Sequence, residues 1–171
     1  PRGILRAVFA NLTSGNATGQ GGSTITQQLA RNAFLTQEQT LKRKLLEVVL
    51  AFEIESKYTK KQILEMYMNQ IYFGQGCYGI QTAAHVYFGK DVKDLSLSQC
   101  AMLAGLPNSP NYYSPFRSLE AAKYRQGIVL DQMAKYGYIS AADAQAAKAA
   151  DVHLAKQDKG KSGAGTAQYF I

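Results

Sequence analysis

The stretch "LKRKLLEVVLAFEIESKY", residues 41–58, decides the fold class of this chain. One set of apolar residues recurs at the three- and four-residue spacing of a helix face: Leu41, Leu45, Val48, Val49 and Phe52. A second set forms another stripe: Leu46, Leu50 and Ile54. Because a helix that is apolar on two sides is normally buried, the pattern predicts that this helix lies largely in the interior of a helical domain.

Helices are expected on both sides of this stretch. Upstream, "GILRAVFANL" (3–12) reads as a helix, "TSGNATGQGG" (13–22) as a loop, and Ser23 as the cap of a helix over 24–35. Downstream, two capping boxes, Thr59 to Gln62 and Ser96 to Gln99, each start a helix. A glycine-rich turn is expected at 74–79, followed by a helix over 80–88 that stops at Gly89. Further helical patterns cover 118–138 and 139–150, and no convincing run of strands is present. The chain is therefore predicted to be mainly α.

Length and charge narrow the functional classes. The 171 residues are 46% hydrophobic, which suits one globular domain with a real core. A formal charge of +7 favours an anionic partner, such as a phosphorylated substrate, an anionic membrane surface or a nucleic acid. No basic stripe with interleaved aromatic residues is present, which argues against nucleic acid. No apolar run reaches the ~20 residues that a membrane span needs.

The stretch "GGSTITQQLARN", residues 21–32, has the features of an anion site at the start of a helix. Free backbone N–H groups and the helix dipole favour negative charge there, and hydroxyl groups add donors. Ser23 and Thr24 supply the hydroxyl donors, and four more polar residues follow on successive turns: Gln27, Gln28, Arg31 and Asn32. An ordinary capped helix would show the same composition, so the residues alone leave both readings open.

A second candidate group combines Arg43, Lys44 and Glu47. A carboxylate beside an apolar stripe loses solvation, while neighbouring cations stabilise its charge, and this competition is typical of catalytic carboxylates. An exposed Arg43–Glu47 pair one turn apart would also fit, and it would contribute only a few tenths of a kcal/mol.

The remaining reactive residues point to structural roles. Cys77 and Cys100 have no CxxC spacing, so two small buried thiols are expected rather than a zinc site. Glu65 is expected to be a buried structural acid, and His85 to be a packing residue. His153 is expected to be solvated.

Taken together, these stretches resemble glycosyltransferase family 51, the peptidoglycan glycosyltransferase domain of class A penicillin-binding proteins. "GGSTITQQLARN" is similar to that family's second motif and "RKLLE" (43–47) to its third. Residues 60–90 resemble the fourth motif and residues 95–116 the fifth. The motifs occur in the family's order over most of the chain, so the resemblance is specific.

The resemblance implies a lysozyme-like helical fold on the outer face of the bacterial cytoplasmic membrane. It implies that lipid II is the acceptor and an undecaprenyl-pyrophosphate-linked glycan the donor. A β-1,4 bond forms with inversion. Glu47 matches an acid proposed to assist the leaving group directly or through a divalent cation such as Mg or Mn. Arg31, Arg43 and Lys44 match positions around the phosphates, and Ser23, Thr24, Gln28 and Asn32 match polar positions of the cleft.

The chain departs from the family pattern in three places. The first motif, which carries the general-base Glu, would precede Pro1, so we expect this fragment to be inactive alone. Gln99 stands where the family usually has Glu, and Gln39 stands where some relatives have Arg.

The resemblance also sets the expected domain limits. The glycosyltransferase domain is expected over 1–155, and 156–171 is expected to be a linker toward a transpeptidase domain. The membrane anchor is expected outside the chain, and cell-wall synthesis proteins are expected as partners.

Two other function classes remain open. A lysozyme-like muramidase or lytic transglycosylase cleaves glycan strands and has no need of a pyrophosphate site, so the basic cluster argues against it. A non-catalytic basic module on anionic lipid would bind through net charge and would lose its affinity in salt.

Overall fold

The computed structural model describes residues 23–34 and 40–156, and every regular element in these ranges is a helix. The isolated pairing of Tyr72 with Tyr78 is the only β-type bridge in the described part. The chain divides into two compact units, Pro1–Ile71 and Tyr72–Ile171. The prediction of a mainly α chain is confirmed. None of the described helices is long and apolar enough to cross a bilayer.

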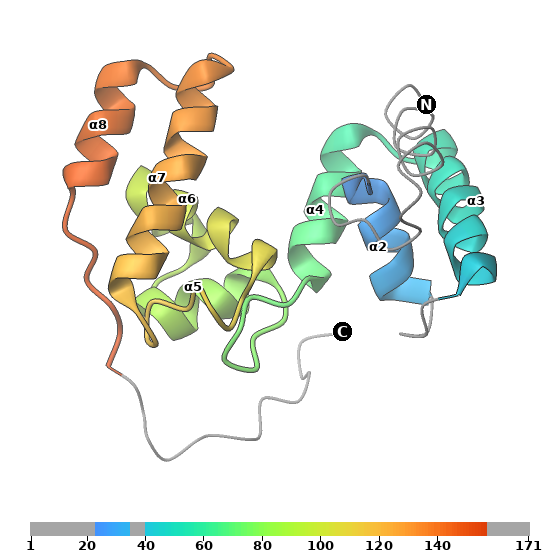
Figure 1. Cartoon of the computed structure of the whole chain (residues 1–171), viewed down its shortest axis with the longest axis horizontal. Helices are drawn as coiled ribbons and strands as arrows, with labels where there is room; N and C mark the ends of the chain where they lie inside the picture. The colour runs from blue at the N-terminus through green and yellow to red at the C-terminus, as the bar shows by residue number, and fades with distance from the viewer. Residues whose placement is uncertain (1–22, 35–39, 157–171) are drawn as a thin grey trace. The chain divides into compact units, whose positions relative to one another are not determined.

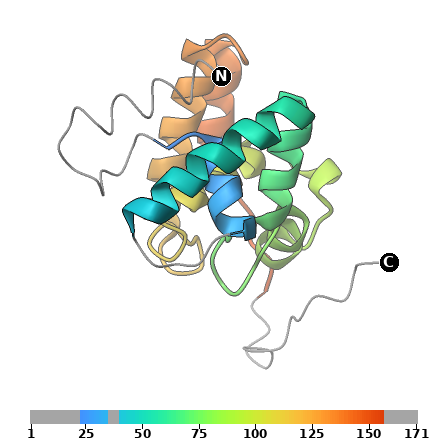
Figure 2. The same ribbon diagram turned by 90° about the vertical axis from the view of Figure 1, so that its right-hand side faces the viewer.

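The first unit contains three described helices, α2 (Ile25–Phe34), α3 (Leu41–Lys57) and α4 (Lys60–Gln70). Helix α2 packs against both α3 and α4, and Figure 2 shows α3 lying across it. In the described part of this unit Ala51 and Ile71 are buried, and four further buried apolar residues form one cluster: Leu29, Ala30, Ile54 and Ile63. Leu50, Met66 and Tyr67 pack against them from the rim.

The expectation that residues 41–58 are largely buried is wrong. Only Glu47, Ala51 and Ile54 of α3 are buried. Their four- and three-residue spacing defines one narrow face, because α3 packs on neighbouring helices along one side. The apolar stripe on another side is solvent-exposed, with Leu41 73%, Leu45 69% and Val49 61% exposed.

The predicted caps are confirmed at two helices and corrected at a third. Thr59 with Gln62 and Ser96 with Gln99 form complete capping boxes. Helix α2 starts one residue later than predicted, and its cap is Thr24 rather than Ser23. The Thr24 hydroxyl accepts from the Gln27 N–H at 3.2 Å. This shift leaves the Ser23 hydroxyl for another partner.

The second unit contains four α-helices and two short 3-10 turns: α5 (Ile80–Phe88), η1 (Val92–Asp94), α6 (Leu97–Gly105), η2 (Leu106–Asn108), α7 (Leu119–Lys135) and α8 (Ala141–Ala149). Figure 1 shows α7 beside α6 and α8, and the contacts agree. Its fully buried side chains are larger than those of the first unit and include Tyr87, Phe73, Met102 and Leu130.

The glycine-rich turn predicted at 74–79 is confirmed. Gly74 has φ +88, and a Cβ there would lie 2.9 Å from the Pro110 carbonyl oxygen, so only glycine fits without strain. The Tyr87 hydroxyl donates to the Phe73 carbonyl at 2.9 Å, and burial raises the pKa of Tyr87 to about 12. The turn is thus fixed onto α5.

Three side chains lie in places that differ from the prediction. Cys77 is buried as expected, but Cys100 is exposed because it lies on the outer side of α6. Glu65 is exposed on α4 rather than buried. His85 is also exposed, because the end of α5 faces solvent. Its Nε2 lies 3.0 Å from an Asp91 carboxylate oxygen. His153 is exposed, as predicted.

Several predictions fall outside the described residues. They are the helix over 3–12, the loop over 13–22, the place of Gln39 and most of the linker over 156–171.

Candidate active site

The candidate active site is centred on a wholly buried carboxylate, Glu47 of α3. Helix α3 begins after Thr40, whose hydroxyl accepts from the Arg43 backbone N–H at 3.1 Å. This cap fixes the first turn of the helix, which carries Arg43 and Lys44, and Glu47 follows one turn later. The sequence thereby places two cations on the same side of α3 as the acid.

Both oxygens of Glu47 lie against cations. Arg43 Nε is 3.3 Å from Glu47 Oε1, and Lys44 Nζ is 2.8 Å from Glu47 Oε2. The Arg43 side chain is 15% exposed and that of Lys44 is 27% exposed. A carboxylate taken out of water costs several kcal/mol unless it is paired, so these cations are what allows Glu47 to be buried with its charge.

Lys44 also connects α3 to the start of α2. Its ammonium group donates to the Ser23 hydroxyl at 2.8 Å while it donates to Glu47. An ammonium group has three donors, so two contacts with described residues leave one for a further acceptor. Ser23 and Glu47 therefore fix the position of the Lys44 ammonium group, which stays partly exposed and keeps one N–H for another acceptor.

The next turns of α2 carry a second polar group. The Tyr67 hydroxyl of α4 donates to the Gln28 carboxamide oxygen at 3.1 Å. Burial raises the pKa of Tyr67, and the nearby positive charge of Arg31 partly opposes that shift. Tyr67 thus stays a neutral donor at physiological pH, and it fixes the orientation of the Gln28 amide.

The structure brings some of the predicted site residues together and leaves others apart. Ser23, Arg43, Lys44 and Glu47 form one connected cluster. Thr24 caps α2, and Gln28 contacts Tyr67 instead. Arg31 is half-buried near Tyr67, and Asn32 is exposed on the last turn of α2.

Sequence reasoning did not predict the contacts of three residues of this region. Thr26 donates from its buried hydroxyl to a Glu55 carboxylate oxygen at 2.9 Å, and this bond ties α2 to α3. Tyr67 orients Gln28, as described above. Gln27 is wholly buried and pairs with Thr24, and the T-x-x-Q spacing of a capping box was the signal that could have found it.

The donor set does not fit a metal ion held by the protein. Within residues 23–34 and 40–156 no three His, Cys, Asp or Glu side chains gather at one place. Glu47 is the buried carboxylate here, and both of its oxygens face cations. Mg²⁺ and Mn²⁺ prefer oxygen ligands without a competing positive charge.

Comparison with known protein families identifies the family of the chain that carries this site. The sequence profile described as Transglycosylase matches residues 1–134. The chain belongs to the transglycosylase family. The matched range includes the whole cluster around Glu47 and most of α7.

Individual relatives of this transglycosylase domain are class A penicillin-binding proteins. It is 48% identical over 161 residues to penicillin-binding protein 1A of Aquifex aeolicus, covering 94% of this chain and 22% of that protein. It is 51% identical over 140 residues to penicillin-binding protein 1A of Escherichia coli, covering 82% and 16%. The domain thus spans about a fifth of the length of these relatives.

A solved structure shares the fold. The crystal structure of penicillin-binding protein 1A from Haemophilus influenzae matches with a TM-score of 0.55 and 28% identity over 80% of this chain and 17% of that one. The predicted lysozyme-like helical fold of the transglycosylase domain is confirmed by this similarity.

Proposed function

We propose that this transglycosylase domain is a peptidoglycan glycosyltransferase that joins lipid II to an undecaprenyl-pyrophosphate-linked glycan. The observation that carries the proposal is Glu47, wholly buried between Arg43 and Lys44 in a chain of this family. Enzymes that only cleave glycan strands need no clamp for a pyrophosphate, whereas this cluster presents an oriented cation.

In the proposed reaction the 4-hydroxyl of the acceptor sugar attacks C1 of the donor sugar. The bond from C1 to the pyrophosphate oxygen breaks, and its electron pair leaves with the pyrophosphate. The acceptor proton goes to a general base, and the configuration at C1 inverts. The negative charge that develops on the leaving oxygen is the charge that the protein must stabilise.

The Glu47 cluster supplies that stabilisation. Lys44 has one donor left for a phosphate oxygen, and Arg43 is held beside it by the same carboxylate. Charge-assisted hydrogen bonds of this kind are about twice as strong as neutral ones. The rest of the diphosphate and sugar site is proposed to be lined by five residues: Arg31, Ser23, Thr24, Gln28 and Asn32. Glu47 acts on the leaving group by fixing the two cations.

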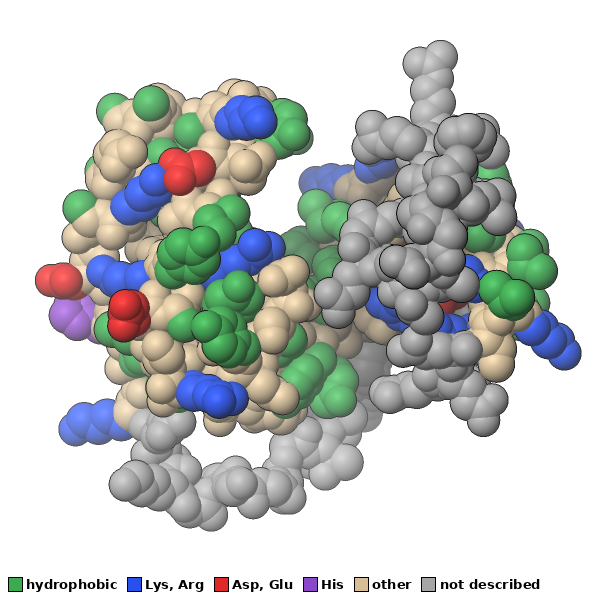
Figure 3. Space-filling model, in the orientation of Figure 1, with side chains coloured by type: hydrophobic (Ala, Val, Ile, Leu, Met, Phe, Trp, Pro, Cys, Tyr) green, Lys and Arg blue, Asp and Glu red, His purple; other side chains and the backbone are tan. Residues whose placement is uncertain are grey.

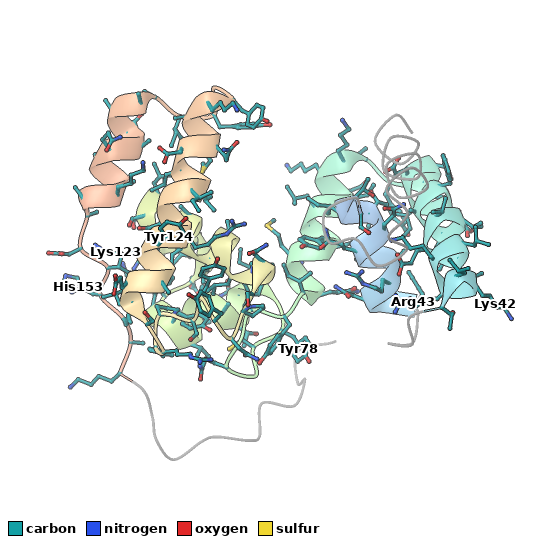
Figure 4. The ribbon with its side chains drawn as sticks, viewed as in Figure 1. Lys42, Arg43, Tyr78, Lys123, Tyr124 and His153 are labelled. Carbon is teal, nitrogen blue, oxygen red and sulfur yellow. The ribbon has the colours of Figure 1, made fainter. Side chains whose placement is uncertain are left out.

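The membrane surface is proposed as a further partner. Leu41, Leu45 and Val49 lie exposed along α3, and Lys42 lies next to this stripe. Figure 3 shows hydrophobic side chains on α3, and Figure 4 shows Lys42 pointing outward. An apolar stripe with a cation beside it suits an anionic bilayer surface. We therefore place the domain at the outer face of the cytoplasmic membrane, where cell-wall synthesis proteins are its expected neighbours.

The 171 residues produced as an isolated polypeptide are proposed to bind the diphosphate without polymerising. A positioned general base contributes about 10²–10⁴-fold, and no side chain of the described site stands free to supply it. Lipid II incubated with this polypeptide should yield no glycan chains, whereas the protein extended upstream through a first motif should make them. Equal rates from the two would contradict this.

The decisive test of the function is product analysis on two substrates. Lipid II should be converted to glycan strands with release of undecaprenyl pyrophosphate by the protein that carries the upstream motif. Polymeric glycan should remain uncleaved. Cleavage of the polymer would instead support a muramidase or lytic transglycosylase. Binding to anionic vesicles that salt abolishes, with no turnover of either substrate, would support a non-catalytic module.

A further inference from the structure

We infer that Gln27 is a positioning residue for the proposed reaction: through the start of α2 it sets where the Lys44 ammonium lies against Glu47. The inference rests on the proposed function. Gln27 is absent from the residues that the sequence motifs assign to the substrate, and its complete burial keeps it from touching substrate directly.

The first step is a reciprocal pair of hydrogen bonds at the start of α2. The Gln27 carboxamide oxygen accepts from the Thr24 backbone N–H at 3.0 Å. The Thr24 hydroxyl accepts from the Gln27 backbone N–H at 3.2 Å. These two bonds fix the backbone of Thr24, and therefore the direction in which the chain leaves the helix toward Ser23.

The second step runs from Ser23 to the acid. Because Ser23 directly precedes Thr24, the position of its hydroxyl follows from the backbone that Gln27 holds. That hydroxyl accepts from Lys44 Nζ at 2.8 Å, and the same nitrogen donates to Glu47 Oε2 at 2.8 Å. A shift of Ser23 would release one of the two contacts that aim the ammonium.

The choice of glutamine at this buried place supports the inference. The Gln27 Nε2 atom has no hydrogen-bond partner among the described residues, so a bond from the amide nitrogen is not the reason for a glutamine at this position. An apolar residue would fill the space without burying an unpaired donor. A glutamate could also accept from Thr24, but it would bury a further negative charge at the base of a clamp built for an anion. Glutamine is the side chain that supplies a neutral acceptor.

A second Thr-x-x-Gln capping box occurs in the first unit, away from the Glu47 cluster. Thr59 and Gln62 form an identical capping box at the start of α4, where Gln62 is exposed. The Gln62 carboxamide oxygen accepts from the Thr59 N–H at 2.9 Å, and neither residue contacts the Glu47 cluster. Gln62 is therefore a matched control for the loss of a helix cap.

The experiment uses the protein extended upstream through the first motif. It measures kcat, KM for lipid II and the melting temperature of four variants. They are Gln27→Met, Ser23→Ala, the double variant of these two, and Gln62→Met. Methionine keeps the length of glutamine and removes both amide groups. Gln27→Met should lower kcat about tenfold with less than a twofold change in KM, since one oriented charge-assisted contact is weakened. Gln62→Met should leave kcat within twofold.

The double variant separates positioning from stability. If Gln27 acts through Ser23, then Gln27→Met should change kcat less than twofold when Ser23 is already alanine. Independent losses that multiply would overturn the inference. So would a Gln27→Met protein that melts earlier but turns over normally per folded molecule.

The outcome for the unmodified protein keeps the two proposals apart. If it does not convert lipid II, the proposed function fails, whatever Gln27 does. If it converts lipid II and Gln27→Met behaves like Gln62→Met, only the role of Gln27 fails.

Discussion

The two units of this domain bury different kinds of residue. In the first unit the buried face of α3 presents Glu47 together with Ala51 and Ile54. In the second unit the buried side chains are large and mostly apolar, and buried Gln126 donates to both the carbonyl and the hydroxyl of Ser98. Among the described residues the first unit thus buries a charged side chain at its candidate site, whereas the second buries mostly apolar side chains.

The largest effect is expected from removing the buried charge. In the protein extended upstream through the first motif, Glu47→Gln should lower polymerisation by at least ~10²-fold, because the two cations lose the carboxylate that aims them. Folding should survive, since glutamine has nearly the same shape. Initial rates with lipid II and a thermal melt would check both points.

Glu53→Gln is the matched control on the same helix. Glu53 is exposed and pairs with Lys57 at 2.6 Å, away from the cluster. This variant should keep its rate within about twofold, as expected for a surface pair. If Glu47→Gln also turns over lipid II at a near-normal rate, the buried charge of the first unit has no catalytic role and the contrast between the two units is wrong.

A core substitution in the second unit should have the opposite profile. Leu130→Ala removes a wholly buried side chain between α6, α7 and α8 and should destabilise the protein by about 2–5 kcal/mol. The rate per folded molecule should stay within about twofold. Urea unfolding followed by kinetics in the native range would test this, and a large loss of kcat would show that the division of roles is wrong.

The cations of the cluster should differ from other cations of the chain. Arg31→Ala, Arg43→Ala and Lys44→Ala should each weaken binding of a phosphoglycolipid inhibitor of the moenomycin type by about tenfold. Lys42→Ala and Lys135→Ala, which remove exposed cations, should change it less than about twofold. Figure 4 shows Lys42 and Arg43 on different sides of α3. Equal losses at all five positions in a titration would favour a membrane module that reads net charge.

The smallest effect concerns the two thiols of the second unit. Burial raises the pKa of both thiols, so the expected difference in rate comes from access of the reagent, because the Cys77 side chain is buried. Cys100 is exposed on α6. At pH 8 a thiol reagent should label Cys100 at least about tenfold faster than Cys77, as mass spectrometry would show. Equal rates would mean that the turn around Cys77 opens readily.

The sequence by itself determined the secondary structure and the identity of the cluster. The capping boxes of α4 and α6, the stop of α5 at Gly89 and the turn at Gly74 depend on nearby residues, so local patterns predicted them. The Arg43, Lys44 and Glu47 group could also be predicted, because its members lie within one turn of a helix.

Only the tertiary structure decided which helix faces are buried. Two stripes of α3 are apolar in sequence, and packing on α2 buried the side that carries Glu47, Ala51 and Ile54 while Leu41, Leu45 and Val49 of the first stripe stayed exposed. Ser23 and Lys44 are distant in sequence, so their 2.8 Å contact could not be predicted from local spacing. The exposure of Cys100, Glu65 and His85 could not be predicted either, because it depends on which side of each helix the neighbouring elements cover. A local pattern shows which side chains share a helix face, but only the packing of other elements determines whether water reaches that face.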